Sequence, residues 1–235
     1  MANLMAAAET HDVRLVFVDN LYVYGPQTAP LRKDIPLTAY GRKPAARAEV
    51  TRLWQAATGR VKIAALRAPD FHGHGVTLSH LGDLAFGSLG RGKAAQLVVP
   101  ADTPHDFDYV PDIARAVELL LDAPDSDFGT AWHMPSAPTQ TLRQIIALGA
   151  AAIGAKPRLV TVPLAVQPLL GLVMPMLREM REMRFQWNRP YQVDASRFTR
   201  RFAFVPTPFA IGAAATARSF LGSAPTPVLG AAVRA

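Results

Sequence analysis

The chain has 235 residues, half of them apolar and 18% charged, so it can bury a sizeable core and is not a disordered protein. Its formal charge of +7 comes from scattered basic residues without a nucleic-acid-binding motif, which argues against a nucleic-acid partner. The absence of cysteine excludes disulfides, a thiolate nucleophile and cysteine-ligated zinc, and it fits a cytoplasmic location.

The first two segments predict a helix and then a buried strand. Met1 to Thr10 is rich in alanine and lacks an N-terminal cap, and no Lys or Arg precedes its apolar part, unlike a secretory signal. Leu15 to Val18 is a continuous apolar run, typical of a strand buried on both faces of a parallel sheet. Because a chain that begins in a helix and feeds a central strand lacks the start of its sheet, we expect this sequence to be truncated.

Polar side chains follow the first strand directly. Asp19 and Asn20 come first, and Tyr22 and Tyr24 precede a Gly-Pro break. Ligands of open α/β sheets bind at the carboxyl ends of the strands, so these four residues are candidates for binding or chemistry. Asn20 can instead close an Asx turn after the strand, and that alternative stays open.

A proline-rich loop at 25–38 separates this strand from the next helix. We expect the helix to begin at Pro44, because proline suits a first helical turn, and to end near Gly59. Tyr40 and Lys43 then lie in the preceding loop, since the residue before a proline is biased away from helical geometry.

A second buried strand is predicted at Val61 to Leu66, and an aromatic and polar loop at 67–75 follows it. Within this loop His72 and His74 are two residues apart and have only Asp70 nearby. These residues do not make a metal-ligand set, so we expect no metal.

The remaining chain alternates helices and strands. We expect helices at 77–89, 110–121 and 141–154, and strands at 97–99, 131–134 and 158–162, and the segments at 194–202 and 209–221 complete the fold. Glycines at 87–92 follow the first of these helices and predict its C-terminal cap and turn.

The stretch at 164–177 is the most hydrophobic part of the chain, within an apolar and methionine-rich segment at 164–183. Two prolines and a length below the roughly 20 residues of a bilayer span argue against a membrane helix. Its methionines predict either core or dimer packing, or the floor of an apolar pocket. They are Met174, Met176, Met180 and Met183.

Four segments, in order, resemble motifs of the NAD-dependent epimerase/dehydratase family, the extended short-chain dehydrogenases. VDNLYVYGP at 18–26 is similar to Ser-Ser-x-x-Val-Tyr-Gly, and LRAPDFHG at 66–73 is similar to Leu-Arg-x-x-x-x-Tyr-Gly. FDYVPDIARA at 107–116 resembles Phe-x-Tyr-Val-Asp-Asp-Val-Ala-x-Ala, and DASRF at 194–198 resembles Asp-x-Ser-Lys. The order and spacing of the four motifs extend the resemblance over nearly the whole chain.

The resemblance implies an α/β fold, a partial Rossmann-like doubly wound parallel sheet with a small mixed α/β substrate domain. Residues 1–75 would be the C-terminal half of the dinucleotide-binding domain. Residues 76–222 would be the substrate domain, with about 107–135 returning to the Rossmann sheet, and 223–235 a loose tail. The family's Gly-x-x-Gly-x-x-Gly turn, which holds the cofactor pyrophosphate at a helix N-terminus, is absent from this sequence.

The resemblance also implies an NAD(P)-dependent enzyme that transfers hydride at a carbinol or carbonyl carbon of a small molecule, with NAD or NADP as cofactor. The family's Tyr-x-x-x-Lys pair is not intact, because Tyr40 and Lys43 are three residues apart. These two remain the candidate acid/base and ribose-binding residues. Asn20 stands where the family has a Ser or Thr that binds the substrate carbonyl, and an amide can donate there too.

Further site residues follow from their positions in the matched motifs. The implied cofactor contacts are Asp19, Asn20, Lys43, Ala68, Pro69 and Phe71. The implied substrate contacts are Tyr22, Tyr24, Asp70, His72 and Trp187, the last in an aromatic and polar loop at 186–191 that could close the pocket. The family often has arginine at the position of Asp106, which argues against a nucleotide-sugar substrate. The methionines of the apolar segment at 164–183 favour a less polar substrate.

Two alternatives remain at this point. The incomplete Tyr/Lys pair leaves open a non-catalytic dinucleotide-sensing or interaction protein on the same fold, with Tyr40 as an ordinary turn residue. The family often dimerises through the helix after this pair, so 44–57 is the expected homodimer interface.

Overall fold

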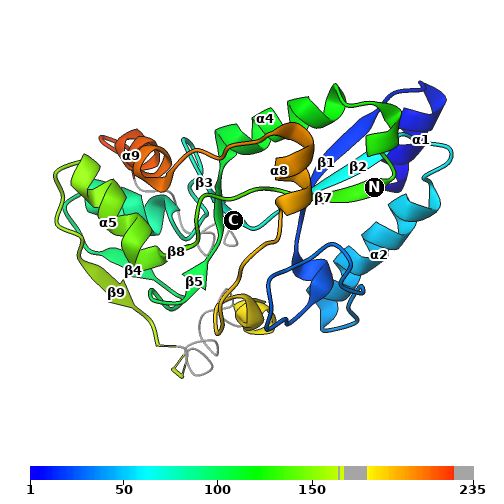
Figure 1. Ribbon diagram of the computed structural model, residues 1–235. Helices are drawn as coiled ribbons and strands as arrows, with labels where there is room; N and C mark the ends of the chain where they lie inside the picture. Colours follow the sequence, from blue (N-terminus) through cyan, green and yellow to red (C-terminus); the bar gives the residue numbers. More distant parts are fainter. Residues whose placement is uncertain (164, 167–178, 225–235) are drawn as a thin grey trace, which may run out of the picture.

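The computed structural model describes residues 1–163, 165–166 and 179–224 (Figure 1). Met174 and Met176, for which the sequence predicts core, dimer or pocket packing, lie outside these residues. In the described part of the chain, no helix has the length and apolar character needed to cross a membrane.

Three parallel strands form the main sheet. β1 (Leu15–Asn20), β2 (Ile63–Ala68) and β7 (Thr130–His133) lie in the order β1-β2-β7, with β2 in the centre. Every residue of β2 is buried, whereas β1, at an edge of the described sheet, is mostly half-buried. The continuous apolar run of β2 therefore reflects burial on both faces, as expected for a parallel sheet.

Helices cover both faces of this sheet (Figure 1). They are α1 (Ala2–Thr10), α2 (Arg42–Ala56), α4 (Val110–Leu121) and α8 (Ser196–Phe202). Alternate side chains of β2 enter two different cores, as the period of a strand requires. Ile63 and Ala65 pack with Trp54 of α2, while Ala64 and Leu66 pack with residues of α4 and α8. The sheet is thus doubly wound.

A second lobe packs around its own core (Figure 1). It contains η2 (Gly82–Gly87), α3 (Ser88–Gly90), β4 (Ala95–Leu97), β5 (Pro104–His105), β8 (Gln140–Thr141), α5 (Leu142–Ala152), β9 (Leu159–Thr161) and α9 (Phe209–Ser219). Thr141 and Gln144 form a reciprocal capping box that begins α5. Phe86, Ile145 and Ala213 are fully buried in the core of this lobe, which packs α5 and α9 against η2.

A parallel strand pair, β3 (Asp70–His72) and β6 (Phe107–Tyr109), joins the two lobes. Three short turns of 3-10 helix complete the described elements. They are η1 (Tyr22–Tyr24), η3 (Asp125–Asp127) and η4 (Arg181–Gln186). Because β3 begins two residues after β2 ends, this junction brings residues of the second lobe to the carboxyl ends of β1 and β2.

Two helix boundaries differ from the sequence prediction. The expected helix at 77–89 begins only at Gly82, because Thr77 accepts a hydrogen bond from the Asp83 N–H at 3.0 Å and closes a turn. The helix expected from Pro44 begins instead at Arg42, with Pro44 buried in its first turn. A carboxylate oxygen of Glu182 accepts the Lys43 N–H at 2.7 Å, so a distant residue caps this helix start.

The close approach of α5 to η2 gives a stability prediction. A methyl group added at Gly149 would overlap the ring of Phe86, which is fully buried and cannot move aside. We expect Gly149→Ala to lower the free energy of unfolding by about 1–3 kcal/mol, the usual cost of overpacking a core. Chemical denaturation of the wild type and the variant measures this difference in the free energy of unfolding. Gly59→Ala is the matched control, since a methyl there meets no atom within 4 Å; equal effects at the two positions would contradict the packing argument.

Candidate functional site

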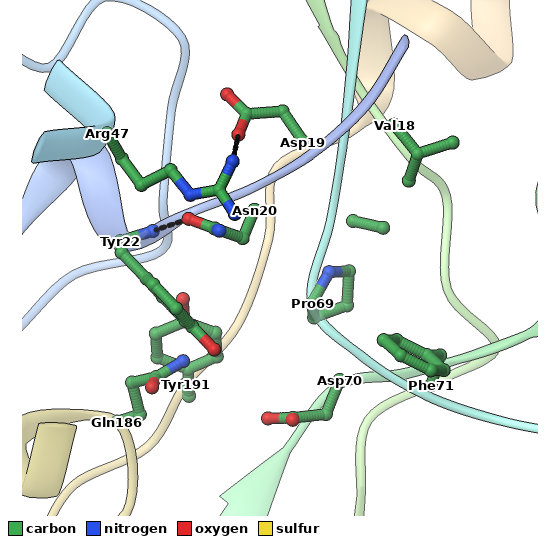
Figure 2. Close-up of a pocket in the computed structure, with 11 residues that line it drawn as sticks. Val18, Asp19, Asn20, Tyr22, Arg47, Pro69, Asp70, Phe71, Gln186 and Tyr191 are labelled. Carbon is green, nitrogen blue, oxygen red and sulfur yellow. Dashed lines mark hydrogen bonds and ion pairs between the residues drawn. The ribbon is translucent and has the colours of Figure 1, made fainter. Parts of the chain in front are cut away.

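A cavity of about 210 Å³ opens at the carboxyl ends of β1 and β2 (Figure 2). Its walls come from β1, η1, α2, β2, β3, the end of η4 and the segment that follows η4. The lining residues are Val18, Asp19, Asn20, Tyr22, Arg47, Ala68, Pro69, Asp70, Phe71, Gln186 and Tyr191. This edge of the sheet is where open α/β folds place their ligands.

One side of the cavity is apolar. Val18, Ala68, Pro69 and Phe71 form it, from the ends of two adjacent strands and the start of β3. Val18 is 50% exposed and Phe71 is 47% exposed, which is high for large apolar side chains beside a buried sheet. Apolar surface gathered in a concave site is typical of small-molecule binding.

The opposite side offers hydrogen-bonding groups. The Asn20 side-chain oxygen accepts the Tyr22 N–H at 3.1 Å, so the Asx turn forms and leaves the amide NH₂ as the ligand-facing donor group. Burial, reinforced by the charge of Asp70, raises the pKa of Tyr22 to about 12. Tyr191 is buried, and this burial raises the pKa of its phenol well above the usual value. Both phenols therefore stay protonated and can donate to a ligand.

A buried arginine fixes the floor of the cavity. Arg67 Nε lies 3.5 Å from one carboxylate oxygen of Asp19, and Arg47 Nη1 lies 3.7 Å from the other. Arg67 also donates to the hydroxyls of Tyr24, at 2.6 Å, and Thr51, at 3.0 Å. Asp19, predicted as a cofactor contact, lines the cavity but is held between two guanidinium groups.

Tyr24, predicted as a substrate contact, does not line the cavity. Its hydroxyl accepts from Arg67 and lies 2.7 Å from His133 Nε2, while His133 Nδ1 lies 3.2 Å from the Asp194 carbonyl oxygen. A guanidinium can only donate and a carbonyl can only accept, so the direction of every bond is fixed. His133 donates a hydrogen bond through Nδ1, and its Nε2 accepts a hydrogen bond from the Tyr24 hydroxyl. Tyr24 is thus part of a buried hydrogen-bond chain.

Asp70 brings a carboxylate to the cavity and is backed by a histidine. Its Oδ2 lies 2.8 Å from His105 Nε2, and His105 Nδ1 lies 3.2 Å from the Gln186 carbonyl oxygen. Burial raises the pKa of Asp70, but the hydrogen bond and charge of His105, with the charge of His80, bring it below the usual value. Asp70 therefore presents a carboxylate near neutral pH.

The structure does not bring Tyr40 and Lys43 to this cavity. Tyr40 is 45% exposed and packs edge-on against Phe185, with ring centroids 5.5 Å apart. The Lys43 ammonium lies 3.1 Å from a carboxylate oxygen of Glu179 and donates to its carbonyl oxygen. Helix α2 instead places Arg47 at the cavity wall.

Two other predicted substrate contacts also lie outside the lining. His72 is buried, and its Nδ1 lies 2.9 Å from the Thr216 hydroxyl in α9. Trp187 is buried behind the cavity and stacks on His105. Among the described residues, no group of three or more His, Asp or Glu side chains is arranged to hold a metal ion.

The structure adds site residues that the sequence did not single out. Val18 and Arg47 line the cavity, as do Gln186 and Tyr191, the two ends of the loop predicted to close the pocket. His105 supports Asp70 from β5. A polar residue inside a helix, such as Arg47, carries no local signal of a site, and the partner of Asp70 is 35 residues away in the chain.

These features define an α/β protein with a ligand cavity at the carboxyl ends of its parallel strands. The profile of the NAD dependent epimerase/dehydratase family matches residues 1–132. The chain belongs to this family. No curated protein matches the sequence.

Solved structures of this fold superpose well on the chain, with low sequence identity. A dTDP-glucose 4,6-dehydratase from Bacillus anthracis, in complex with NAD, matches with a TM-score of 0.70 and 16% identity, over 93% of this chain and 65% of that one. A UDP-glucuronic acid 4-epimerase from Bacillus cereus, with NAD and a UDP-sugar, gives 0.74 and 13%, over 93% and 65%. A UDP-glucose 4-epimerase from Thermus thermophilus, with NAD, gives 0.70 and 17%, over 95% and 69%. The chain thus spans about two thirds of the length of these structures, and its doubly wound parallel sheet is Rossmann-like.

Two buried histidines predict how stability depends on pH. Burial lowers the pKa of His72 to about 4, and burial together with Arg67 lowers that of His133 to about 4. An unfolded histidine titrates near pH ~6.5. Between these values the unfolded chain binds more protons, so the free energy of unfolding falls as the pH is lowered.

We expect His133→Gln and His72→Gln each to weaken this pH dependence, because each removes one group that gains a proton on unfolding. The measurement is chemical denaturation at neutral pH and near pH 5. The free energy of unfolding of each variant should fall short of the wild-type value by a smaller amount near pH 5 than at neutral pH. An equal loss at both pH values would show that the replaced histidine does not titrate on unfolding.

Proposed function

We propose that the cavity binds the nicotinamide end of NAD or NADP beside a carbinol or carbonyl carbon of a small substrate. The protein would then be an oxidoreductase of the epimerase/dehydratase type. The observation that carries the proposal is one cavity with an apolar wall and an opposing set of hydrogen-bond donors, at the strand ends, in a member of this family. The cavity volume of about 210 Å³ suits a flat ring and a small group rather than a whole dinucleotide.

The residues present fit the nicotinamide end of such a cofactor. Val18, Pro69 and Phe71 offer flat apolar contact, and the Asn20 amide offers a donor. The fit does not extend to the pyrophosphate. In the part of the chain that the structure describes, no glycine-rich turn joins a strand of the main sheet to a helix N-terminus. The proposal therefore assigns this chain only the nicotinamide and substrate end of the site.

A bound nicotinamide cofactor supplies the hydride chemistry. The residues of the chain bind and orient the reactants around it. Tyr22 and Tyr191, held protonated by burial, donate to oxygen atoms of a substrate, and Asn20 can donate to a carbonyl oxygen. Arg47, half exposed at the cavity wall and close to Asp19, would attract an anionic group of a ligand.

A second candidate function is dinucleotide sensing without turnover. The observation in its favour is the position of Tyr40 and Lys43, which contact Phe185 and Glu179 rather than the cavity. On this hypothesis the cavity would bind a cofactor but would not oxidise or reduce a second molecule. Turnover of any carbonyl compound by the chain would exclude it.

Calorimetric titration of the 235-residue chain with NAD, NADP and nicotinamide mononucleotide tests the proposed binding. We expect a dissociation constant below about 1 mM for at least one of them, equivalent to about −4 kcal/mol. Ala68→Phe should abolish the binding, because the added ring would occupy the cavity.

Ala56→Phe is the matched control, because this exposed helical alanine is not part of the lining. Circular dichroism verifies that both variants are folded. Retained binding in Ala68→Phe would place the cofactor elsewhere. No binding by the wild-type chain would contradict the cofactor assignment for this chain.

A further inference from the structure

The strongest unassigned feature is the hydrogen-bonded pair of Asp70 and His105 at the cavity wall. Asp70 belongs to β3, and His105 belongs to β5 of the second lobe. We propose that Asp70 is the proton-exchanging residue of the cavity and that His105 is its positioning residue, the two sharing one proton between Oδ2 and Nε2. This inference rests on the proposed function, since it assigns the proton transfer that accompanies carbinol or carbonyl chemistry.

The hydrogen-bond partners of His105 require a shared proton. Both ring nitrogens face oxygen atoms, the Gln186 carbonyl at 3.2 Å and the Asp70 carboxylate at 2.8 Å. A carbonyl oxygen and a carboxylate only accept, and a neutral imidazole has a single N–H. With Nδ1–H donating to Gln186, the bond to Asp70 needs one further proton, and we place it on the ring at Nε2. Without it, two lone pairs would face each other.

The surroundings of His105 favour a positively charged ring at this position. The imidazole is fully buried and stacks on Trp187, with centroids 3.8 Å apart and an interplanar angle of 2°. It also stacks on Tyr191, at 4.8 Å and 14°. Aromatic faces attract cations. These contacts fix the ring plane, so His105 holds the Asp70 carboxylate in one orientation at the cavity.

The other titratable residues of the lining are unsuited to proton exchange near neutral pH. Asp19 is held between Arg47 and Arg67. Burial raises the pKa of Tyr22 to about 12 and places that of Tyr191 well above its usual value. A guanidinium such as Arg47 does not give up its proton in proteins. Asp70 is the remaining ionisable group among the residues that line this cavity.

Several charged and titratable groups surround the pair and enter its pH dependence. His80 approaches from the turn before η2, and burial lowers its pKa. Asp106 and Asp108 follow His105 along the chain, and burial raises the pKa of both. Tyr22 and Tyr191 face the pair from the cavity side as neutral phenols.

The proposed step is a single proton transfer. The O–H bond of a substrate hydroxyl breaks, and a new O–H bond forms at Asp70 Oδ1 while the Oδ2 atom keeps its bond to the shared proton. In the reverse direction Asp70 returns the proton to a substrate oxygen. The electron pair that leaves or reaches the carbon is carried by the nicotinamide cofactor of the proposed function. His105 does not touch the substrate and acts only through Asp70.

Nitrogen-15 NMR of histidine-labelled protein tests the shared proton without any substrate. Wild-type His105 should show protons on both ring nitrogens near neutral pH. Asp70→Asn should leave one bare nitrogen, because the amide NH₂ can donate to Nε2 and no shared proton is needed. His105→Gln identifies the resonances. A single ring proton in the wild type, or an unchanged ring in Asp70→Asn, would overturn the proposal.

Oxidation of NADH and NADPH with dihydroxyacetone as the probe carbonyl tests the role. We expect Asp70→Asn to lower kcat/KM by about 100-fold or more, the scale of general acid–base catalysis, with cofactor binding unchanged by calorimetry. His105→Gln should shift the pH profile, a change that loss of packing alone would not cause. Asp102→Asn is the matched control, since its carboxylate pairs with Arg143 on the surface.

The two measurements separate failure of the inference from failure of the proposed function. An active Asp70→Asn enzyme would overturn the inference and leave the function intact. A wild-type chain that neither binds a cofactor nor oxidises it would contradict the proposed function, and the NMR result alone would then decide whether Asp70 and His105 share a proton.

Discussion

A guanidinium buried at the end of the central strand organises the site. Arg67 is 2% exposed and contacts Asp19 at the end of β1, Tyr24 in η1 and Thr51 in α2. Burial of an unpaired charge costs several kcal/mol, so these partners must stay in place around it. The chain from Tyr24 through His133 to the Asp194 carbonyl extends the same constraint to β7. Three strands and a helix are thereby held together beneath the cavity.

Residues from outside the main sheet complete the cavity and support its carboxylate. The strand ends alone supply the apolar wall and Asn20, whereas Gln186 is the last residue of η4 and Tyr191 lies in the segment after it. His105, from β5 of the second lobe, reaches Asp70 beside the end of the central strand. The chemistry proposed for the cavity therefore depends on the contact between β3 and β5, because the carboxylate and the histidine that supports it come from these two elements.

The parts of the fold that local patterns encode were predictable. The helix at 110–121 has the predicted bounds, since a proline in its first turn and a strong apolar periodicity mark it. Thr141 caps α5 as a threonine in that position should. The helix expected at 77–89 was wrong in its first turns, because a backbone bond between Thr77 and Asp83 competes with helix there. The start of α2 was set by Glu182, 139 residues from Lys43, which no local pattern can indicate.

The sequence by itself determined the family, the α/β class and the segments that bear the site, because motifs and buried strands are properties of neighbouring residues. It also indicated Asn20 and Tyr22, since ligands of open α/β sheets bind at the carboxyl ends of strands, while the resemblance to the family motif indicated Asp70 and Phe71. Only the tertiary structure decided which polar groups face the cavity and which support it. Tyr24 and Asp70 both follow buried strands. The Tyr24 hydroxyl is hydrogen-bonded to Arg67 away from the cavity, whereas Asp70 lines the cavity. That difference depends on partners distant in the chain, and a buried polar group is defined by the partners that satisfy it.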